Sequence, residues 1–327
     1  MKTGAFSAQA QTTQTAAAHI RAGELVAFPT ETVYGLGADA SNDTAVAKIF
    51  AAKGRPADHP LIVHIASAAQ VKHYASSVPA FAERLMQAFW PGPLTVILPR
   101  KPGVARAAAG GQNSIGLRCP AHPLALEFLT ACNTGVAGPS ANKFGRVSPT
   151  TAQHVMQEFG ATLLVLDGGP CKVGIESSIV DCTRAQPVLL RPGVLTREQL
   201  SAACGQAVLS PDYATDDAPR APGTLQAHYA PNAKVRLMDA KAIQTALDLL
   251  GTDAAHIAVY ARSIVRIPSA NVLYRRMPDD ALATAEQLFA VLRDFDAQEV
   301  KLIWIEPVPE AAQWDGVRDR LARAAAS

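Results

Sequence analysis

The stretch "LLVLDGGPCKVGIESSIVDCTRAQPVLLR", residues 163–191, decides the fold class of this chain. Three short apolar runs, at 163–166, 178–181 and 188–191, are predicted to be strands, and Gly, Pro and polar residues separate them. No segment with helical periodicity lies between them. A strictly repeating β-α-β array is therefore disfavoured, and a mixed α/β sheet is expected.

Upstream of this stretch, helices and strands alternate irregularly. Strands are predicted at 25–28, 61–65, 94–98 and 114–118, with a short one ending near Val136. Helices are predicted at 44–52 with Thr44 as N-cap, at 79–89, 123–131 and 196–203, and from Ser148 as N-cap with Pro149 in the first position. Residues 1–18 lack an apolar core, so we expect a short frayed lead-in rather than a secretory signal.

Residues 206–232 differ in composition from the rest. They contain four prolines and a cluster of aspartates, which is typical of a linker. After them, strands are predicted at 235–238, 257–260 and 302–305, and helices at 240–250, 281–294 and 310–325. The expected organisation is thus a domain over 1–205, a linker over 206–232, and a smaller C-terminal α/β domain with a Rossmann-like sheet over 233–327.

Composition excludes several classes of protein. No apolar run approaches the roughly 18 residues of a membrane span, so a cytoplasmic location is the default expectation. The five cysteines are odd in number and include no CxxC pair, which argues against a zinc site and a disulfide framework. Residues 1–205 carry 17 Lys and Arg against 12 Asp and Glu. This mild excess suits an anionic ligand but does not demand stable nucleic-acid binding.

Two stretches near the start of the chain could carry chemistry. "FPTETVYGLGADA", residues 28–40, places hydroxyl side chains and glycines after a buried strand, where α/β sheets bind ligands; a plain polar connection is the alternative. "KGRPADHPLIVHI", residues 53–65, sets Lys53 and Arg55 beyond a predicted helix. They could bind phosphates, or they could cap that helix. His64 taken alone is more often a core residue than a ligand.

Three further stretches combine hydroxyls and arginines near strand ends or helix starts, although each also has an ordinary structural explanation. These are "NSIGLRCP" with Ser114 and Arg118, "GPSANKFGRVSPTT" with Ser140, Asn142 and Ser148, and "GIESSIVD" with "LLRPG", which hold Ser177, Ser178 and Arg191. The sequence has no GxxxxGK[ST], GxGxxG or GxSxG motif. A nucleotide would therefore need a pocket of Ser-, Thr-, Lys- and Arg-rich loops.

Together these motifs resemble the L-threonylcarbamoyladenylate synthase family, the YrdC-like enzymes. The resemblance rests on "PTETVYGLG", "KGRP", "PLIVHI", "WPGPLT", "SIGLR", "PSAN", "SPT", "GIESSIVD" and "LLRPG", in the family's order over about residues 20–205. "APGTLQAHYAP" and residues 233–327 are similar to the linker and added domain of the family's long form. The implied fold is a twisted open mixed sheet with a concave, positively charged face.

The resemblance also implies the reaction and the roles of the residues. L-threonine, bicarbonate and ATP would give threonylcarbamoyl-AMP and pyrophosphate, for the threonylcarbamoyladenosine modification of tRNA. Thr32, His64, Arg118 and Ser178 would bind threonine, and Lys53 and Arg55 would be the catalytic cations at the phosphates. The ATP-binding set would be Arg55, His59, Ser114, Ser140, Asn142, Ser148, Arg191 and Tyr229, with Tyr229 and the linker acting as a lid. His59 stands where relatives often have Asn.

The implied cofactors and partners follow from this reaction. Mg2+ would accompany ATP, held by phosphates and water rather than by a carboxylate cage, and no protein metal site is expected. A threonylcarbamoyl-transferase complex would take the product, tRNA would be involved indirectly, and no membrane would be. One alternative is a non-catalytic binder of double-stranded RNA or tRNA, which the modest charge disfavours. A carbamoyl-transfer maturation protein is a third, disfavoured by the missing CxxC pairs.

Overall fold

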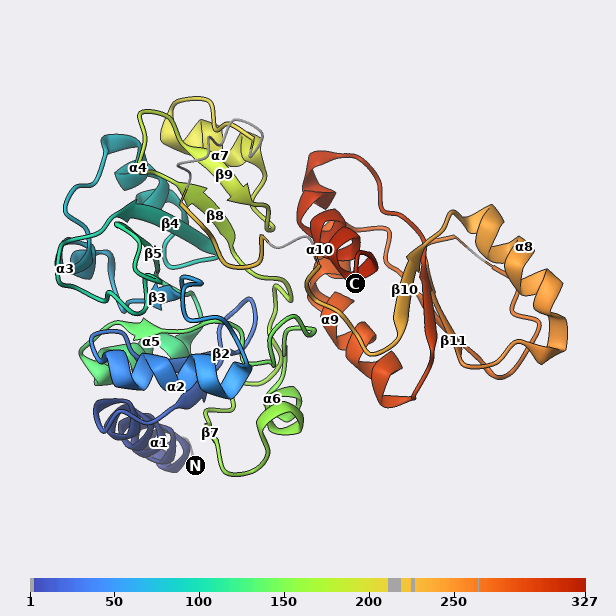
Figure 1. Cartoon of the computed structure of the whole chain (residues 1–327), viewed down its shortest axis with the longest axis horizontal. Coiled ribbons are helices and arrows are strands. Elements are labelled where there is room, and N and C mark those ends of the chain that lie inside the picture. The colour runs from blue at the N-terminus through green and yellow to red at the C-terminus, as the bar shows by residue number, and fades with distance from the viewer. Residues whose placement is uncertain (1–2, 211–218, 225–226, 264) are drawn as a thin grey trace. The chain divides into compact units, whose positions relative to one another are not determined.

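The chain forms two compact units, each described here by itself. The computed structural model describes residues 3–210, 219–224, 227–263 and 265–327, with side chains from residue 12 onward (Figure 1). The first unit comprises residues 1–144 and 148–224, and the second comprises residues 145–147 and 225–327. Residues 211–218 and 225–226 of the predicted linker lie outside the described residues.

A nine-stranded sheet forms the centre of the first unit, with strand order β7-β1-β2-β6-β3-β5-β4-β8-β9. Three neighbouring pairs are parallel (β1 with β7, β3 with β5, β4 with β8), and the other five are antiparallel. The prediction of a mixed sheet is confirmed. The strands are β1 (Val26–Phe28), β2 (Gly35–Asp39), β3 (Ile62–His64), β4 (Leu94–Pro99), β5 (Ser114–Arg118), β6 (Val136–Ala137), β7 (Leu164–Val165), β8 (Ser178–Asp181) and β9 (Val188–Arg191).

Helices cover the two faces of this sheet unequally. On one face, apolar residues of α2, α4 and α7 pack against inward-facing strand residues such as Val63, Val96 and Leu117. On the other face, α1 and α5 pack together over β1 and β6. The helices are α1 (Thr3–Arg21), α2 (Asp43–Lys53), α3 (Val71–Tyr74), α4 (Ala80–Phe89), α5 (Pro123–Cys132), α6 (Ala152–Phe159) and α7 (Arg197–Cys204).

The rest of that second face carries a different set of residues. Ile62, Ile97 and Ile179 form a small apolar cluster there, and linker residue Ala221 packs against it. Because side chains alternate along a strand, His64, Gly116 and Arg118 lie on the same face as Ile62. The strands of this stretch, from β3 to β9, carry five of the predicted site residues: His64, Ser114, Arg118, Ser178 and Arg191.

Several local predictions were wrong. Residues Thr3–Arg21 form a helix rather than a frayed lead-in, because an alanine-rich segment favours helix and Ala16, Ala17 and Ile20 are buried with α5. The loop expected over residues 28–40 contains β2, which pairs with β1 as a hairpin. Glycine at position 35 makes this pairing possible, since a Cβ there would lie 2.9 Å from the Phe28 ring.

Two predicted helix caps were also wrong. Asn42, not Thr44, caps α2, because its side-chain oxygen accepts a hydrogen bond from the Ala45 amide at 3.0 Å. Thr151, not Ser148, caps α6, accepting from the His154 amide at 3.2 Å. The hydroxyl of Ser148 donates instead to Glu176, and the cap of α6 is Thr151.

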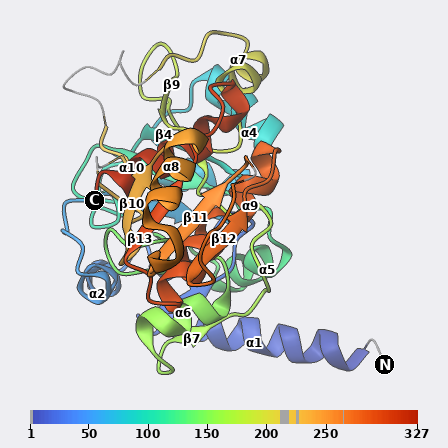
Figure 2. The ribbon, with the colours of Figure 1, turned by 90° about the vertical axis from the view of Figure 1, so that its right-hand side faces the viewer.

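The second unit is a smaller α/β domain with a four-stranded, fully parallel sheet of order β10-β13-β11-β12. Figure 2 looks onto α8 in front of these strands, and Figure 1 shows α9 and α10 on the opposite side of the sheet. The predicted parallel α/β character is confirmed, although β12 was not predicted. The elements are β10 (Lys234–Leu237), α8 (Ala240–Leu250), β11 (Ile257–Ala261), β12 (Val272–Arg276), α9 (Ala281–Ala297), β13 (Leu302–Ile305) and α10 (Asp315–Ala325).

Candidate active site

The register of the sheet brings His64 and Arg118 together. They are paired residues at the carboxyl ends of the parallel strands β3 and β5, so their side chains leave the same face side by side. Gly138, just after β6, leaves room beside them. A Cβ there would lie 3.0 Å from His64 Nδ1 and 2.9 Å from the Phe28 ring.

Arg118 is buried and held by three acceptors. Its Nη1 donates to Thr32 Oγ1 at 2.8 Å, its Nη2 to Glu31 Oε1 at 2.6 Å, and its Nε to the Gly92 carbonyl at 3.3 Å. The other oxygen of Glu31 accepts from the Ala121 amide at 3.0 Å, just before α5. The guanidinium is therefore fixed in orientation, with N–H groups in excess of these three bonds for a ligand carboxylate.

His64 is 3% exposed and neutral at ordinary pH. Burial, followed by the charge of Arg118, lowers its pKa to about 3. Its ring contacts Phe28 edge to face, with centroids 5.3 Å apart. The Nδ1 atom makes no hydrogen bond to the part of the chain that the structure describes, so a ligand could satisfy this buried polar atom.

Lys53 ends α2 and is tied to the loop after β6. Its Nζ donates to the carbonyl of Ser140 at 2.6 Å and to that of Asn142, and its own carbonyl accepts from the Phe144 amide at 2.8 Å. The C-terminus of α2 is capped by the backbone of Gly54, so the helix-capping alternative does not apply to Lys53. Burial, and then the charge of Arg55, holds its pKa well below the usual range.

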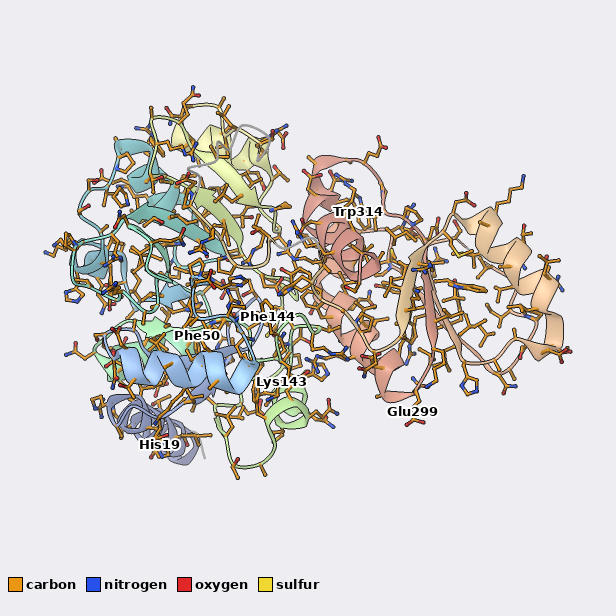
Figure 3. All side chains as sticks on the ribbon, viewed as in Figure 1. His19, Phe50, Lys143, Phe144, Glu299 and Trp314 are labelled. Atoms are coloured by element: carbon orange, nitrogen blue, oxygen red, sulfur yellow. The ribbon has the colours of Figure 1, made fainter. Side chains whose placement is uncertain are left out.

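Arg55 and His59 flank the aromatic ring of Phe144, which is labelled in Figure 3. The guanidinium carbon of Arg55 lies 5.7 Å from the ring centroid, and the His59 ring meets it edge to face at 5.6 Å. Arg55 Nη2 also donates to the Pro60 carbonyl at 2.9 Å. Burial, followed by Arg55, lowers the pKa of His59. These two predicted ATP contacts thus form one cluster with the loop held by Lys53.

A second cluster joins β8, β9 and the linker. Arg191 donates to the carbonyl of Ser177 at 3.1 Å, to its hydroxyl at 3.2 Å, and to the carbonyl of linker residue Pro222 at 3.0 Å. The Ser177 hydroxyl also lies 2.8 Å from that of Thr95. Arg191 therefore ties linker residue Pro222 to the strand ends of the first unit.

The remaining predicted residues are Ser178, Ser114 and Tyr229, which contact neither the His64–Arg118 pair nor the Lys53 cluster through any side-chain hydrogen bond described here. Ser178 donates to the Leu195 carbonyl at 3.3 Å, and Ser114 is half-buried at the end of β5 opposite to Arg118. Tyr229 belongs to the second unit, where it is 1% exposed, stacked on Phe289 with centroids 5.4 Å apart and covered by the Arg320 guanidinium. These contacts are all within the protein, so the predicted ligands of Ser178, Ser114 and Tyr229 stay predictions.

Two acidic residues were missed by sequence reasoning. Glu31 orients Arg118, and Glu176 accepts a hydrogen bond from Ser148, both within buried surroundings. Each lies inside a stretch that was selected for its hydroxyl side chains. The presence of a carboxylate among these hydroxyls, with candidate arginines nearby, could have predicted a structural partner for an arginine or a hydroxyl. Across the described residues, no group of three or more His, Cys, Asp or Glu side chains could hold a metal ion.

Comparisons with known proteins cover both units. The Sua5/YciO/YrdC family model, described as "Telomere recombination", matches residues 18–193, and the model "Threonylcarbamoyl-AMP synthase, C-terminal domain" matches residues 195–326. The chain belongs to the threonylcarbamoyl-AMP synthase family. The resemblance stated from the sequence motifs is thus confirmed, including that to the long form with its added domain.

Individual members of the family are similar over nearly the whole chain. The threonylcarbamoyl-AMP synthase of Pyrococcus abyssi is 40% identical over 94% of this chain and 92% of its own length, and that of Bacillus subtilis is 38% identical over 95% and 92%. The crystal structure of P. abyssi Sua5 complexed with L-threonine superposes with a TM-score of 0.86, at 38% identity, over 96% of this chain and 94% of that one.

Proposed function

We infer that this protein is a threonylcarbamoyl-AMP synthase, a nucleotidyltransferase that acts on L-threonine and ATP. The observation that carries this function is Arg118, held by Glu31 and Thr32 beside a neutral His64 on one sheet face. An arginine fixed in this way recognises a carboxylate, which every amino acid carries. The similarity over the full length to a protein solved with L-threonine supports the same substrate.

The chemistry assigns distinct tasks to the residues. The threonine amine forms a carbamate, with bicarbonate by releasing water or with CO2 by releasing a proton, and an oxygen of this carbamate attacks the α-phosphorus of ATP. The new bond is between this oxygen and phosphorus, and the bond to pyrophosphate breaks. Because the protein need not form a covalent intermediate, positioning and charge neutralisation carry the rate. Bicarbonate as the carbon source belongs to this proposal.

We propose that the threonine subsite consists of Thr32, His64, Arg118 and Ser178. Arg118 would bind the carboxylate, and the hydroxyls and the neutral imidazole would hold the amine and the side chain. His64 Nδ1 supports this assignment, since it is buried and makes no hydrogen bond to the described residues. Ser178 is buried, and its amide donates to the carbonyl of Pro93 at 3.0 Å, next to the Gly92 carbonyl that accepts from Arg118.

We propose that ATP binds along the two clusters around Lys53 and Arg191. Lys53 and Arg55 would face the phosphates. Lys53 uses two of its donors on the loop carbonyls of Ser140 and Asn142, which leaves one N–H for a phosphate oxygen. The other proposed ATP contacts are His59, Ser114, Ser140, Asn142, Ser148, Arg191 and Tyr229. Mg2+ would enter with ATP, bound through phosphate and water.

Further steps are also proposals. The product would pass to a threonylcarbamoyl-transferase that modifies tRNA in the cytoplasm, and tRNA would not be a substrate of this chain. Among the described helices, none is long and apolar enough to cross a membrane. Tyr229, which stacks on Phe289 and lies against the Arg320 guanidinium in the second unit, would close over the nucleotide.

The test of the function is a pyrophosphate-release assay on the full chain. With ATP, Mg2+, bicarbonate and L-threonine, we expect pyrophosphate release that depends on threonine and formation of threonylcarbamoyl-AMP. The non-catalytic RNA-binding alternative predicts no such release and tight tRNA binding at physiological salt. Absence of threonine-dependent release would remove the proposed function.

A further inference from the structure

Three residues of the loop after β6 belong to the second unit. The loop runs from Gly138 to Thr151, and Gly145–Val147 are grouped with residues 225–327. The Ala230 amide donates to the Gly145 carbonyl at 2.8 Å, and Arg146 and Ala230 form a parallel bridge. The chain thus enters the second unit after Phe144 and leaves it before Ser148.

Helix α9 supplies the side chains that hold this segment. Arg293 donates through Nη2 to the Val147 carbonyl. Arg146 donates to the side chain of Asn232 and lies 3.6 Å from the Asp296 carboxylate. We call Arg293 and Asp296 the α9 clamp.

Asp296 of the α9 clamp is itself held by backbone amides of the second unit. Both oxygens of Asp296 accept from the Asn232 amide at 2.8 Å, and one accepts from the Ala233 amide at 3.2 Å. Leu292 and Phe295, the neighbours of the clamp on α9, are buried in the second unit. Because α9 is fixed by its apolar face, the positions of Gly145–Val147 follow those of the helix.

The flanks of the clamped segment carry proposed ATP contacts. Asn142 lies three residues before Gly145, and Ser148 follows Val147 directly. Lys53 holds the first flank through the carbonyls of Ser140 and Asn142, and on the second flank Ser148 donates to the buried carboxylate of Glu176. The α9 clamp holds Gly145–Val147, the three residues of the loop between these two flanks.

We propose that Arg293 and Asp296 are positioning residues for ATP, through which the C-terminal unit sets the geometry of the nucleotide loop. This inference rests on the proposed ATP site and extends it. It gives the second unit a role in substrate binding that does not require any of its side chains to touch the nucleotide. The proposed threonine subsite, built on β3, β5, β8 and the loop after β1, should be independent of the clamp.

The test compares the wild-type chain with Arg293→Ala, Arg293→Lys and a control, Arg275→Ala. Arg275 also pairs with an aspartate of α9, Asp294, at 3.0 Å, but this pair is exposed and distant in sequence from the loop. Arg293→Lys keeps one donor for the Val147 carbonyl. The measurements are ATP affinity by calorimetry, KM for ATP and for threonine, thermal stability, and amide hydrogen exchange over residues 138–151.

Loss of a charged hydrogen bond to the loop predicts that Arg293→Ala weakens ATP affinity and raises its KM by about tenfold. Hydrogen exchange over 138–151 should rise, KM for threonine and the melting temperature should stay near wild type, and Arg293→Lys should recover most of the loss. Wild-type ATP affinity in Arg293→Ala would overturn the proposal, as would equal losses for ATP and threonine. Calorimetry measures ATP binding without turnover. An inactive wild-type protein would therefore contradict the proposed function but would leave the test of the clamp valid.

Discussion

At the scale of single residues, Arg118 is the centre of the proposed threonine subsite. Arg118→Ala should raise KM for threonine about 30-fold or more, because a bidentate bond between guanidinium and carboxylate is lost, and should leave ATP affinity within threefold. Steady-state kinetics with each substrate varied gives both numbers. Arg106→Ala, which removes an exposed arginine, is the control. A change in ATP affinity as large as that for threonine would count against the assignment.

His64 makes a prediction about acid stability. Its folded pKa of about 3 lies below the ordinary value of 6.5, so the unfolded chain binds this proton more readily between these two values. Stability should therefore fall as pH is lowered below 6.5. From pH 7 to 5, His64 should cost about 2 kcal/mol, and His64→Gln should remove that part of the loss. Urea unfolding at both pH values measures this, and identical losses in wild type and variant would contradict it.

Lys53 and Arg55 make the third prediction at this scale. Lys53→Ala and Arg55→Ala should each lower kcat by about 100-fold or more, because each removes a cation proposed to face the phosphates. The fold should stay intact, which near-wild-type circular dichroism and cooperative unfolding of both variants would show. Turnover close to wild type in both variants would leave them a structural role only.

At the scale of elements, the sequence predicted strands and helices where a single period dominated. β8, β9 and α8 were found where their apolar patterns placed them. β2 was missed because its glycines lower strand propensity. These glycines allow the Phe28 ring to pack closely against the backbone of β2, a contact that is visible only in the folded structure. The cap of α6 was misplaced because Ser148 satisfies the pattern of a cap but bonds to Glu176, a residue 28 positions away.

The site could be predicted as a set of residue types but not as an arrangement. The motifs singled out Thr32, His64 and Arg118. The strand register pairs His64 with Arg118, and Thr32 accepts a hydrogen bond from Arg118. The motifs could not show that Lys53 donates hydrogen bonds to two carbonyls of the loop after β6, because such contacts depend on the path of the backbone. Glu31 was missed for the same reason, since its role appears only once Arg118 lies beside it.

At the scale of the whole molecule, Tyr229 links the linker to the second unit. Tyr229 adopts a φ of +60° and lies buried between Phe289 and Arg320. If it serves as the proposed lid, Tyr229→Ala should speed ATP dissociation by about tenfold, while threonine binding changes little, as the loss of an aromatic contact predicts. Stopped-flow release of a fluorescent ATP analogue measures this rate. An unchanged rate would refute the lid and leave Tyr229 as a core residue of the second unit.

The central claim is that this chain joins threonine, bicarbonate and ATP in one reaction. The most direct measurement follows isotope-labelled bicarbonate into a product that contains both AMP and threonine, with pyrophosphate counted in parallel. We predict one labelled carbon per pyrophosphate, incorporated only when L-threonine and ATP are both present. Pyrophosphate release without labelled product, or no release on adding threonine, would contradict the claim.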